Sequence, residues 1–187
     1  MATRNTAAVH SVYFYDTEEA LIQRLVGIVN SALNSGNAAL MVVTPDHAEQ
    51  LMQFLSSRLF RTVQDTTRLT IVDAEATLQR FMMDGSPDPE RFFAAIKGLI
   101  DEASIPAEQV GGKLTVFGEM VAVLWGRGEK QAALALEQLW NETLQENRFF
   151  LHCAYPRTQF LFDKDPSGLM SICEQHTHTF GDLDVAM

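Results

Sequence analysis

KLTVFGEMVAVLWGRG, residues 113–128, is the stretch that decides the fold. Its first part alternates apolar residues with others, which predicts a buried strand. Gly118 ends that strand, Glu119 follows directly, and the next segment is apolar and contains Trp125. Ligands of open parallel sheets bind just beyond the carboxyl ends of the strands. A lone carboxylate among apolar residues at this position therefore predicts the floor of a pocket.

Further strands are predicted on both sides of this stretch, and helices separate them. Runs of β-branched, aromatic or other apolar residues predict strands at 9–15, 38–43, 68–73 and 148–154, with a shorter one near Gln159–Phe162. Apolar residues at helical spacing predict helices between 16 and 34, at 45–59, at 74–83, from 88 to a turn-rich stretch at 106–112, at 129–147 and at 167–176. This alternation predicts an α/β fold of three layers, in which helices cover both faces of a mostly parallel central sheet of five or more strands.

The bulk composition limits the classes of function. The chain has 187 residues, of which 47% are apolar. We expect one domain over 1–187, with a core at about 9–163 and a C-terminal helix and tail at 164–187. The formal net charge is −10 and the pI is near 4.8. Such a chain would be repelled by nucleic acid and by anionic membranes, so neither is expected as a partner.

Other features of the sequence predict a cytoplasmic protein. The N-terminus lacks the apolar core of a signal peptide, and no stretch approaches the roughly 18 apolar residues that span a bilayer. The two cysteines, Cys153 and Cys173, do not make a disulfide framework. We therefore expect both to be reduced thiols.

Polar side chains follow the predicted strands, and a parallel sheet would bring them to one edge. They are Asp16, Thr44 with His47, Asp73, Glu119 and Tyr155. Asp16, Thr44 and Asp73 are equally good helix N-caps. Tyr155 is equally a core tyrosine whose hydroxyl has a partner. Glu119 favours a pocket role, because a carboxylate among apolar residues is costly to bury without a partner.

The turn after the first strand argues against the common nucleotide sites. Its sequence, YDTEEAL at 15–21, has no glycine and carries three acidic residues. A phosphate-binding loop needs glycines that aim backbone N–H groups at the anion, and a dinucleotide fold needs GxGxxG. Nucleotide hydrolysis is therefore not expected. A phospho-receiver domain is a rival interpretation with Asp16 and Asp73 as its acids, but Ala154-Tyr155-Pro156 replaces the lysine that it needs after the fifth strand.

Two weaker constellations could carry chemistry. Cys173, His176 and His178 have a spacing that a metal could use, but they are only three donors on a predicted exposed tail, and mobile tail histidines are favoured. Cys153 could serve as a nucleophile beside a histidine. Its neighbour His152 points to the opposite face of the strand, so a buried, inert thiol is favoured. We therefore predict no catalytic residues, no metal and no cofactor.

Longer motifs resemble a known family. They are VHSVYFYDTEEAL, VVTPDH, LTIVDAEATLQRFMMDGSPDPERF, FGEMVAVLWGRGEKQAALALEQLWNETL, FFLHCAYPRTQF and ICEQHTH, and together they extend from about Val9 to Thr179. The sequence is similar to the MEDS domain, the methanogen/methylotroph DcmR-type sensory domain. The resemblance implies a core like that of RecA or the circadian-clock ATPase, without a phosphate-binding loop. It also implies a sensor of small organic molecules, such as hydrocarbon or one-carbon derivatives, that is coupled to a histidine kinase or a DNA-binding regulator.

We expect a cytoplasmic, non-catalytic sensing domain that binds a small organic ligand at the strand ends and signals to a protein partner, such as a histidine kinase or regulator. The expected ligand-binding residues are Glu119, Asp16, Asp73, Tyr155, Trp125, Tyr13, Met120 and His47. The carboxylates would take the polar end of the ligand, and the aromatic residues and Met120 would form apolar walls. The alternative is a degenerate ATPase-fold module for protein interaction or homo-oligomer formation, whose strand-end acids are satisfied internally and which binds no small ligand.

Overall fold

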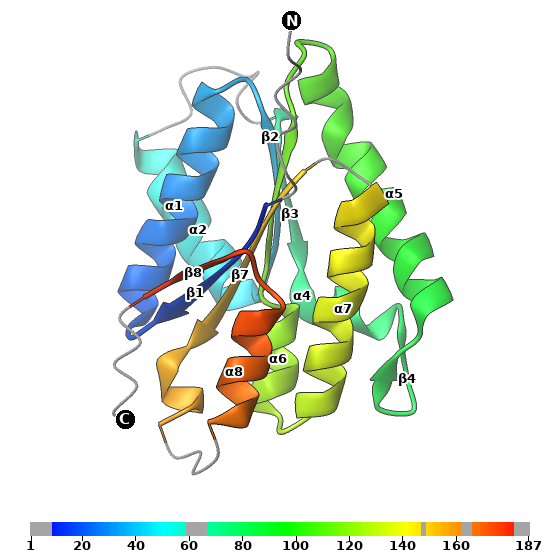
Figure 1. Ribbon diagram of the computed structural model, residues 1–187. Coiled ribbons are helices and arrows are strands. Elements are labelled where there is room, and N and C mark those ends of the chain that lie inside the picture. The colour runs from blue at the N-terminus through cyan, green and yellow to red at the C-terminus, as the bar shows by residue number, and fades with distance from the viewer. Residues whose placement is uncertain (1–8, 59–66, 147–148, 162–165, 182–187) are drawn as a thin grey trace, which may run out of the picture.

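Among the described residues, six strands form one sheet in which all neighbours run parallel (Figure 1). The computed structural model describes residues 9–58, 67–146, 149–161 and 166–181. The strands are β1 (Val9–Tyr15), β2 (Ala38–Val43), β3 (Leu69–Asp73), β6 (Leu114–Gly118), β7 (Phe150–Pro156) and β8 (His178–Phe180), in the order β3-β2-β6-β7-β1-β8. A separate antiparallel pair consists of β4 (Met82–Met83) and β5 (Ser86–Pro87).

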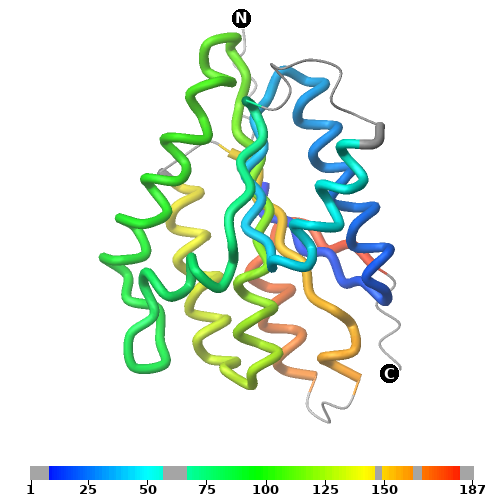
Figure 2. The backbone as a smooth tube through the Cα atoms, turned by 180° about the vertical axis from the view of Figure 1, so that it is seen from behind, coloured from blue at the N-terminus to red at the C-terminus, as the bar shows by residue number. Residues whose placement is uncertain are grey.

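Helices lie on both faces of the sheet and complete three layers (Figures 1 and 2). One face is covered by α1 (Glu18–Asn34) and α2 (Pro45–Arg58). The other face is covered by α4 (Ala74–Gln79), α5 (Pro89–Glu108), α6 (Met120–Gly126), α7 (Lys130–Glu146) and α8 (Ser167–Glu174). The predicted three-layer α/β fold is confirmed, and the arrangement is consistent with a RecA-like core.

The position of each strand in the sheet explains its composition. Every residue of β2, AALMVV, is buried, because this strand has a neighbour on each side and helices above and below. At the end of β6, Gly118 is in register with Val42 of β2 and Cys153 of β7. The carboxyl ends of these strands therefore lie at one edge of the sheet, as a parallel arrangement requires.

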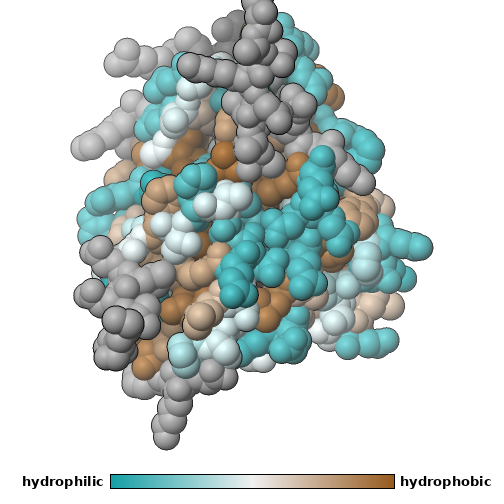
Figure 3. Space-filling model, viewed as in Figure 1, coloured by the Kyte–Doolittle hydropathy of each residue, from teal (hydrophilic) through white to brown (hydrophobic). Residues whose placement is uncertain are grey.

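The two sides of α7 differ in the way expected of a helix that covers a sheet. Its inner side carries the buried residues Ala133, Leu136, Glu137, Trp140 and Leu144. Its outer side carries the exposed residues Gln131, Gln138, Glu142 and Gln145. Figure 3 shows hydrophilic side chains gathered over this helix. Among the helices that the structure describes, none combines the length and apolar character needed to cross a membrane.

The predicted boundaries of α1, α4 and α5 are each wrong at one end. The N-cap of α1 is Thr17 and not Asp16, since the hydroxyl of Thr17 accepts the N–H of Ala20 at 3.2 Å. The helix predicted at 74–83 ends at Gln79, and β4 follows. Helix α5 continues through Pro106 into the predicted turn-rich stretch. A proline removes one hydrogen bond from the last turn, and that turn stays packed because its alanines at 103 and 107 are buried.

The C-terminal part of the described chain also differs from the prediction. In place of a strand near Gln159–Phe162, residues Arg157–Gln159 form a 3-10 helix, and residue 162 lies outside the described residues, as do 59 and 147–148. Helix α8 ends two residues early, and β8 then pairs with β1. Thr177 explains this pairing: its N–H donates to the carbonyl of His10 at 2.7 Å, and its hydroxyl donates to the same carbonyl at 2.8 Å.

Candidate functional site

Glu119 lies at the carboxyl end of β6, where the sequence predicts the floor of a pocket. The residue is 3% exposed. Its carboxylate Oε2 accepts the backbone N–H of Thr44 at 2.9 Å, and its own N–H donates to the carbonyl of Val42 at 3.0 Å. The side chain does not cap α6, although the residue directly precedes that helix. These contacts hold the buried carboxylate against the end of β2 and the start of α2.

His47 of α2 lies between two carboxylates. Its Nδ1 is 2.7 Å from Oε1 of Glu119, and its Nε2 contacts the carboxylate of Glu18 at the start of α1. Burial of the ring would lower the pKa of His47, but the hydrogen bonds and charges of Glu119 and Glu18 outweigh it and raise the pKa to about 9. His47 is therefore an imidazolium at neutral pH, and three helices meet around it.

A depression of about 200 Å³ opens beside this pair. Its lining includes Tyr15, His47, Glu119, Ala122, Val123 and Pro156. Gln159 also lines it: the amide Nε2 donates to the carbonyl of Ala122 at 3.3 Å, while the buried Oε1 has no hydrogen-bond partner among the described residues. Burial, together with the charges of Glu18 and Glu119, raises the pKa of Tyr15 well above its usual range, so its phenol is neutral. The depression combines mostly apolar walls with a charged pair.

Three other predicted ligand-binding residues lie outside this depression. Asp16 is exposed and forms an ion pair with Arg157 at 3.3 Å. Asp73 caps α4 by accepting the N–H groups of Glu75 at 2.7 Å and Ala76 at 3.2 Å, which confirms the capping alternative for this residue. Tyr13 stacks on Tyr15 with ring centroids 6.4 Å apart. A role of these residues in ligand binding stays a prediction.

Met120, Trp125 and Tyr155 belong to the core below the helices α6, α7 and α8. The rings of Trp125 and Tyr155 pack edge to face with centroids 6.2 Å apart. The hydroxyl of Tyr155 donates to Oε1 of Glu137 at 2.8 Å, as expected of the core tyrosine that was the alternative interpretation. The depression beside Glu119 is lined by none of the three.

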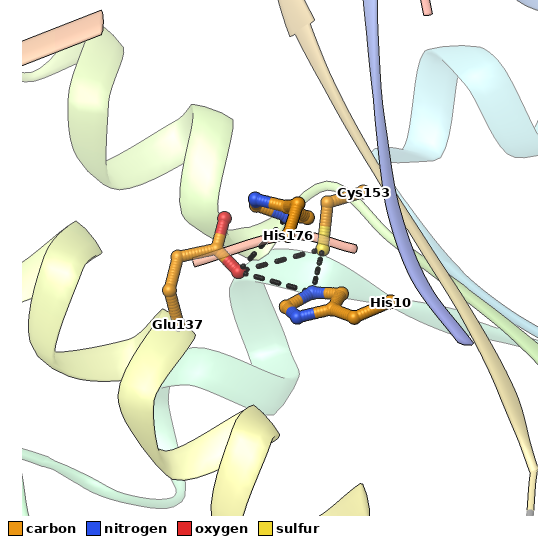
Figure 4. A group of neighbouring side chains, drawn as sticks. All are labelled: His10, Glu137, Cys153 and His176. Atoms are coloured by element: carbon orange, nitrogen blue, oxygen red, sulfur yellow. Dashed lines mark hydrogen bonds and ion pairs between the residues drawn. The ribbon is translucent and has the colours of Figure 1, made fainter. Parts of the chain in front are cut away.

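Through its hydrogen bond to Glu137, Tyr155 contacts a second group of buried side chains, shown in Figure 4. The group consists of His10 of β1, Glu137 of α7, Cys153 of β7 and His176 after α8. Their side-chain ligand atoms all lie within 4.8 Å of one another. Burial opposes the charge of Glu137, yet His176, His10 and the Tyr155 hydroxyl together hold its pKa below the ordinary value. Burial and the neighbouring carboxylate raise the pKa of the Cys153 thiol.

The tail interpretation is wrong for His176. Its side chain is 0% exposed and points into the buried group, and the ring of His10 lies 4.0 Å away between centroids. The other two predicted tail donors do not join it: Cys173 is half-buried elsewhere and His178 is exposed on β8. One sequence signal for this group was Glu137, a carboxylate on the otherwise apolar inner stripe of α7.

A larger depression of about 530 Å³ lies at the opposite end of the strands, between α1 and the starts of β6 and β7. Arg24, Ser31, Phe150 and His152 line it. Burial, with the charges of Arg24 and His10, lowers the pKa of His152 to about 4, so this ring is neutral. Its volume exceeds that of the depression at Glu119, but none of the described residues that line it carries a carboxylate.

The fold and the strand-end geometry define an α/β domain with a doubly covered parallel sheet and an acidic turn where nucleotide enzymes place a phosphate-binding loop. The sequence model of the MEDS family, described as the MEthanogen/methylotroph, DcmR Sensory domain, matches residues 9–177. The chain belongs to this family, and its membership supports a sensing role in signalling. No curated protein and no solved structure matches the chain.

Proposed function

We propose that this protein is a cytoplasmic, non-catalytic sensing domain that binds a small organic molecule in the depression beside Glu119. The observation that carries the proposal is the buried ion pair of Glu119 and His47 on the lining of that depression. Binding pockets are mostly apolar with a few placed polar groups, and this site has that composition. The sensory character of the family supports the same conclusion.

The size of the depression limits the ligand to a few non-hydrogen atoms. Its volume of about 200 Å³ lies below the roughly 300–1,000 Å³ of pockets for drug-sized molecules. A carboxylate has about four lone-pair sites, and two described donors, from Thr44 and His47, use part of that capacity at Glu119. Glu119 can therefore accept a further hydrogen bond from a ligand. A short-chain alcohol or amine fits this combination of apolar walls and an acceptor.

The same residues offer a route from binding to a signal. Glu18, His47 and Glu119 link the starts of α1, α2 and α6 through one imidazolium. A ligand changes a conformational equilibrium only if it binds one conformation better than the other. A ligand that competes for Glu119 would weaken the link between these helices and so alter the surface offered to a protein partner, such as a histidine kinase or regulator.

Filling the depression tests the proposal. We expect methanol, ethanol, propanol and the corresponding amines to include at least one ligand whose amide NMR shifts concentrate at residues 119–126. Val123→Trp places an indole in the depression and should weaken that ligand by about 10-fold or more, which corresponds to about 1.4 kcal/mol. Ser31→Trp fills the larger depression instead and serves as the matched control with unchanged affinity. Shifts that concentrate around Phe150, or affinity lost only in the control, would contradict the proposal.

A second candidate function is a protein-interaction or homo-oligomer module. The observation that favours it is that the three strand-end acids have partners within the chain: Asp16 pairs with Arg157, Asp73 caps α4 and Glu119 pairs with His47. Sedimentation equilibrium distinguishes the two candidates. Self-association at micromolar concentration, combined with no amide shifts from any of the alcohols and amines, would favour the module.

A further inference from the structure

We propose that His10, Glu137, Cys153 and His176 form a binding site for one divalent transition-metal ion, with Zn²⁺ as the preferred ion. This site is separate from the depression proposed to bind the organic ligand, since the two share no lining residue. Figure 4 shows the four side chains converging from different elements of the fold.

Four of the six distances between the ligand atoms are close to those of a tetrahedral site, and all six lie within 4.8 Å. Nε2 of His10 lies 3.3 Å from Oε2 of Glu137 and 3.4 Å from Sγ of Cys153. Oε2 of Glu137 lies 3.7 Å from the same sulfur and 3.5 Å from Nε2 of His176. Metal–ligand bonds of about 2.0–2.3 Å at tetrahedral angles put the ligand atoms about 3.3–3.6 Å apart. An ion placed among the four atoms would reach bonding distance from each of them once the two remaining pairs, which involve Nε2 of His176, close to a similar spacing.

Hydrogen bonds outside the cluster orient the ligands for a metal. Nδ1 of His10 lies 2.9 Å from the amide oxygen of Asn141, and Nδ1 of His176 lies 2.7 Å from the carbonyl of Ile172. A ring nitrogen beside an oxygen acceptor carries the proton, so each Nε2 presents its lone pair to the cluster. Metal-binding histidines have this outer contact almost always, and it fixes their tautomer. The second oxygen of Glu137 is held in the same way by the Tyr155 hydroxyl at 2.8 Å.

The charge of the site also favours a divalent ion. A thiolate and a carboxylate together carry two negative charges, and two neutral imidazoles add none, so one divalent cation makes the buried group neutral. Without an ion, the negative charge of the buried Glu137 carboxylate is stabilised by His10, His176 and the Tyr155 hydroxyl. Nε2 of His176 then has no hydrogen-bond partner among the described residues. Sulfur and imidazole ligands select Zn²⁺ and related transition metals over Mg²⁺ or Ca²⁺. Four protein ligands are typical of structural zinc sites.

The ion would join parts of the chain that are far apart in sequence. His10 lies on β1, Glu137 on α7, Cys153 on β7, and His176 in the segment between α8 and β8. When the ion binds, the Cys153 thiol releases its proton to solvent and a metal–sulfur bond forms. No electron is transferred. Binding therefore fixes the C-terminal segment on the core and stabilises the folded chain.

The test is the metal content of the full chain, expressed with Zn²⁺ and purified without a chelator or a histidine tag. We expect about one zinc per chain by plasma mass spectrometry. Cys153→Ala and His176→Ala should each lower the zinc content at least 10-fold. Cys173→Ala and His178→Ala are the matched controls, because they remove the other cysteine and a nearby exposed histidine, and both should keep the zinc. Tyr155→Phe should weaken binding by about 10–100-fold through loss of its hydrogen bond to Glu137.

Cobalt substitution keeps the test decisive if a variant does not fold. The wild-type chain, stripped of metal and titrated with Co²⁺, should show thiolate-to-cobalt charge-transfer absorption that saturates at one equivalent and disappears on addition of excess Zn²⁺. Wild-type chain that carries no zinc and gives no such absorption would overturn the proposal. Zinc lost from the Cys173 or His178 variant but kept by the Cys153 and His176 variants would also overturn it, because the tail would then hold the ion.

Discussion

Truncation of Trp140 to alanine should lower the free energy of unfolding by about 3–5 kcal/mol, the usual cost of removing a large aromatic side chain from a core. Trp140 is 1% exposed on the inner side of α7. Its ring packs at 90° against Phe92 of α5, with centroids 5.3 Å apart. The backbone around it belongs to regular helix packed on a sheet, so the cavity left by the indole has few ways to collapse.

Urea unfolding monitored by circular dichroism measures this loss. The matched control is Ile105→Ala, which truncates an apolar side chain on α5 that is 54% exposed, and its effect should stay within about 0.5 kcal/mol. A loss below about 1 kcal/mol for Trp140→Ala would contradict the packing of α5 against α7. Unchanged slopes of the unfolding transitions would show that both variants unfold in the same way as the wild type.

Much of the fold could be predicted from the sequence because an interior strand is a continuous run of apolar residues, which is easy to recognise. The run AALMVV at 38–43 is buried throughout, and the predicted bounds of this strand and of the strand at 9–15 agree with the structure. Short segments were harder to predict. β8 has three residues, all exposed, and depends on the contacts of Thr177 with His10, which lie 167 positions apart. Local periodicity contains no information about such a contact.

A site residue could be predicted only where its neighbours in the sequence marked it. Glu119 follows a glycine at a strand end, which marked it in the sequence, and the structure pairs it with His47, another residue predicted for the site. Glu18, the third member, was not singled out in the sequence, because it is one of three acidic residues in the turn at 15–21. The buried group in Figure 4 needed tertiary information, because its donors come from β1, α7, β7 and the segment between α8 and β8, which are far apart in the sequence. Glu137 alone had a local signal, namely its place on an apolar helical stripe.

The pH dependence of stability should reveal the ion pair at Glu119. The pKa of His47 is raised from 6.5 to about 9 in the folded chain. Between these two pH values the folded state binds a proton that the unfolded state has lost, so the contribution is complete below about pH 6.5 and disappears as the pH rises through 9. The shift corresponds to about 3 kcal/mol before screening. Glu18 is 61% exposed, and solvent screening reduces the expected loss to roughly 1–2 kcal/mol.

The comparison of wild type with His47→Gln isolates this effect, because the cysteines and the chain terminus titrate in both proteins. Free energies of unfolding from urea titrations at pH 6.5 and pH 9.5 should fall more steeply in the wild type, by that 1–2 kcal/mol. Glu119→Gln should flatten the wild-type fall in the same way, since the amide cannot stabilise an imidazolium as a buried carboxylate does. Parallel pH profiles for the wild type and His47→Gln would show that His47 is not held as a cation between the carboxylates. The proposed link between α1, α2 and α6 through one imidazolium would then be wrong.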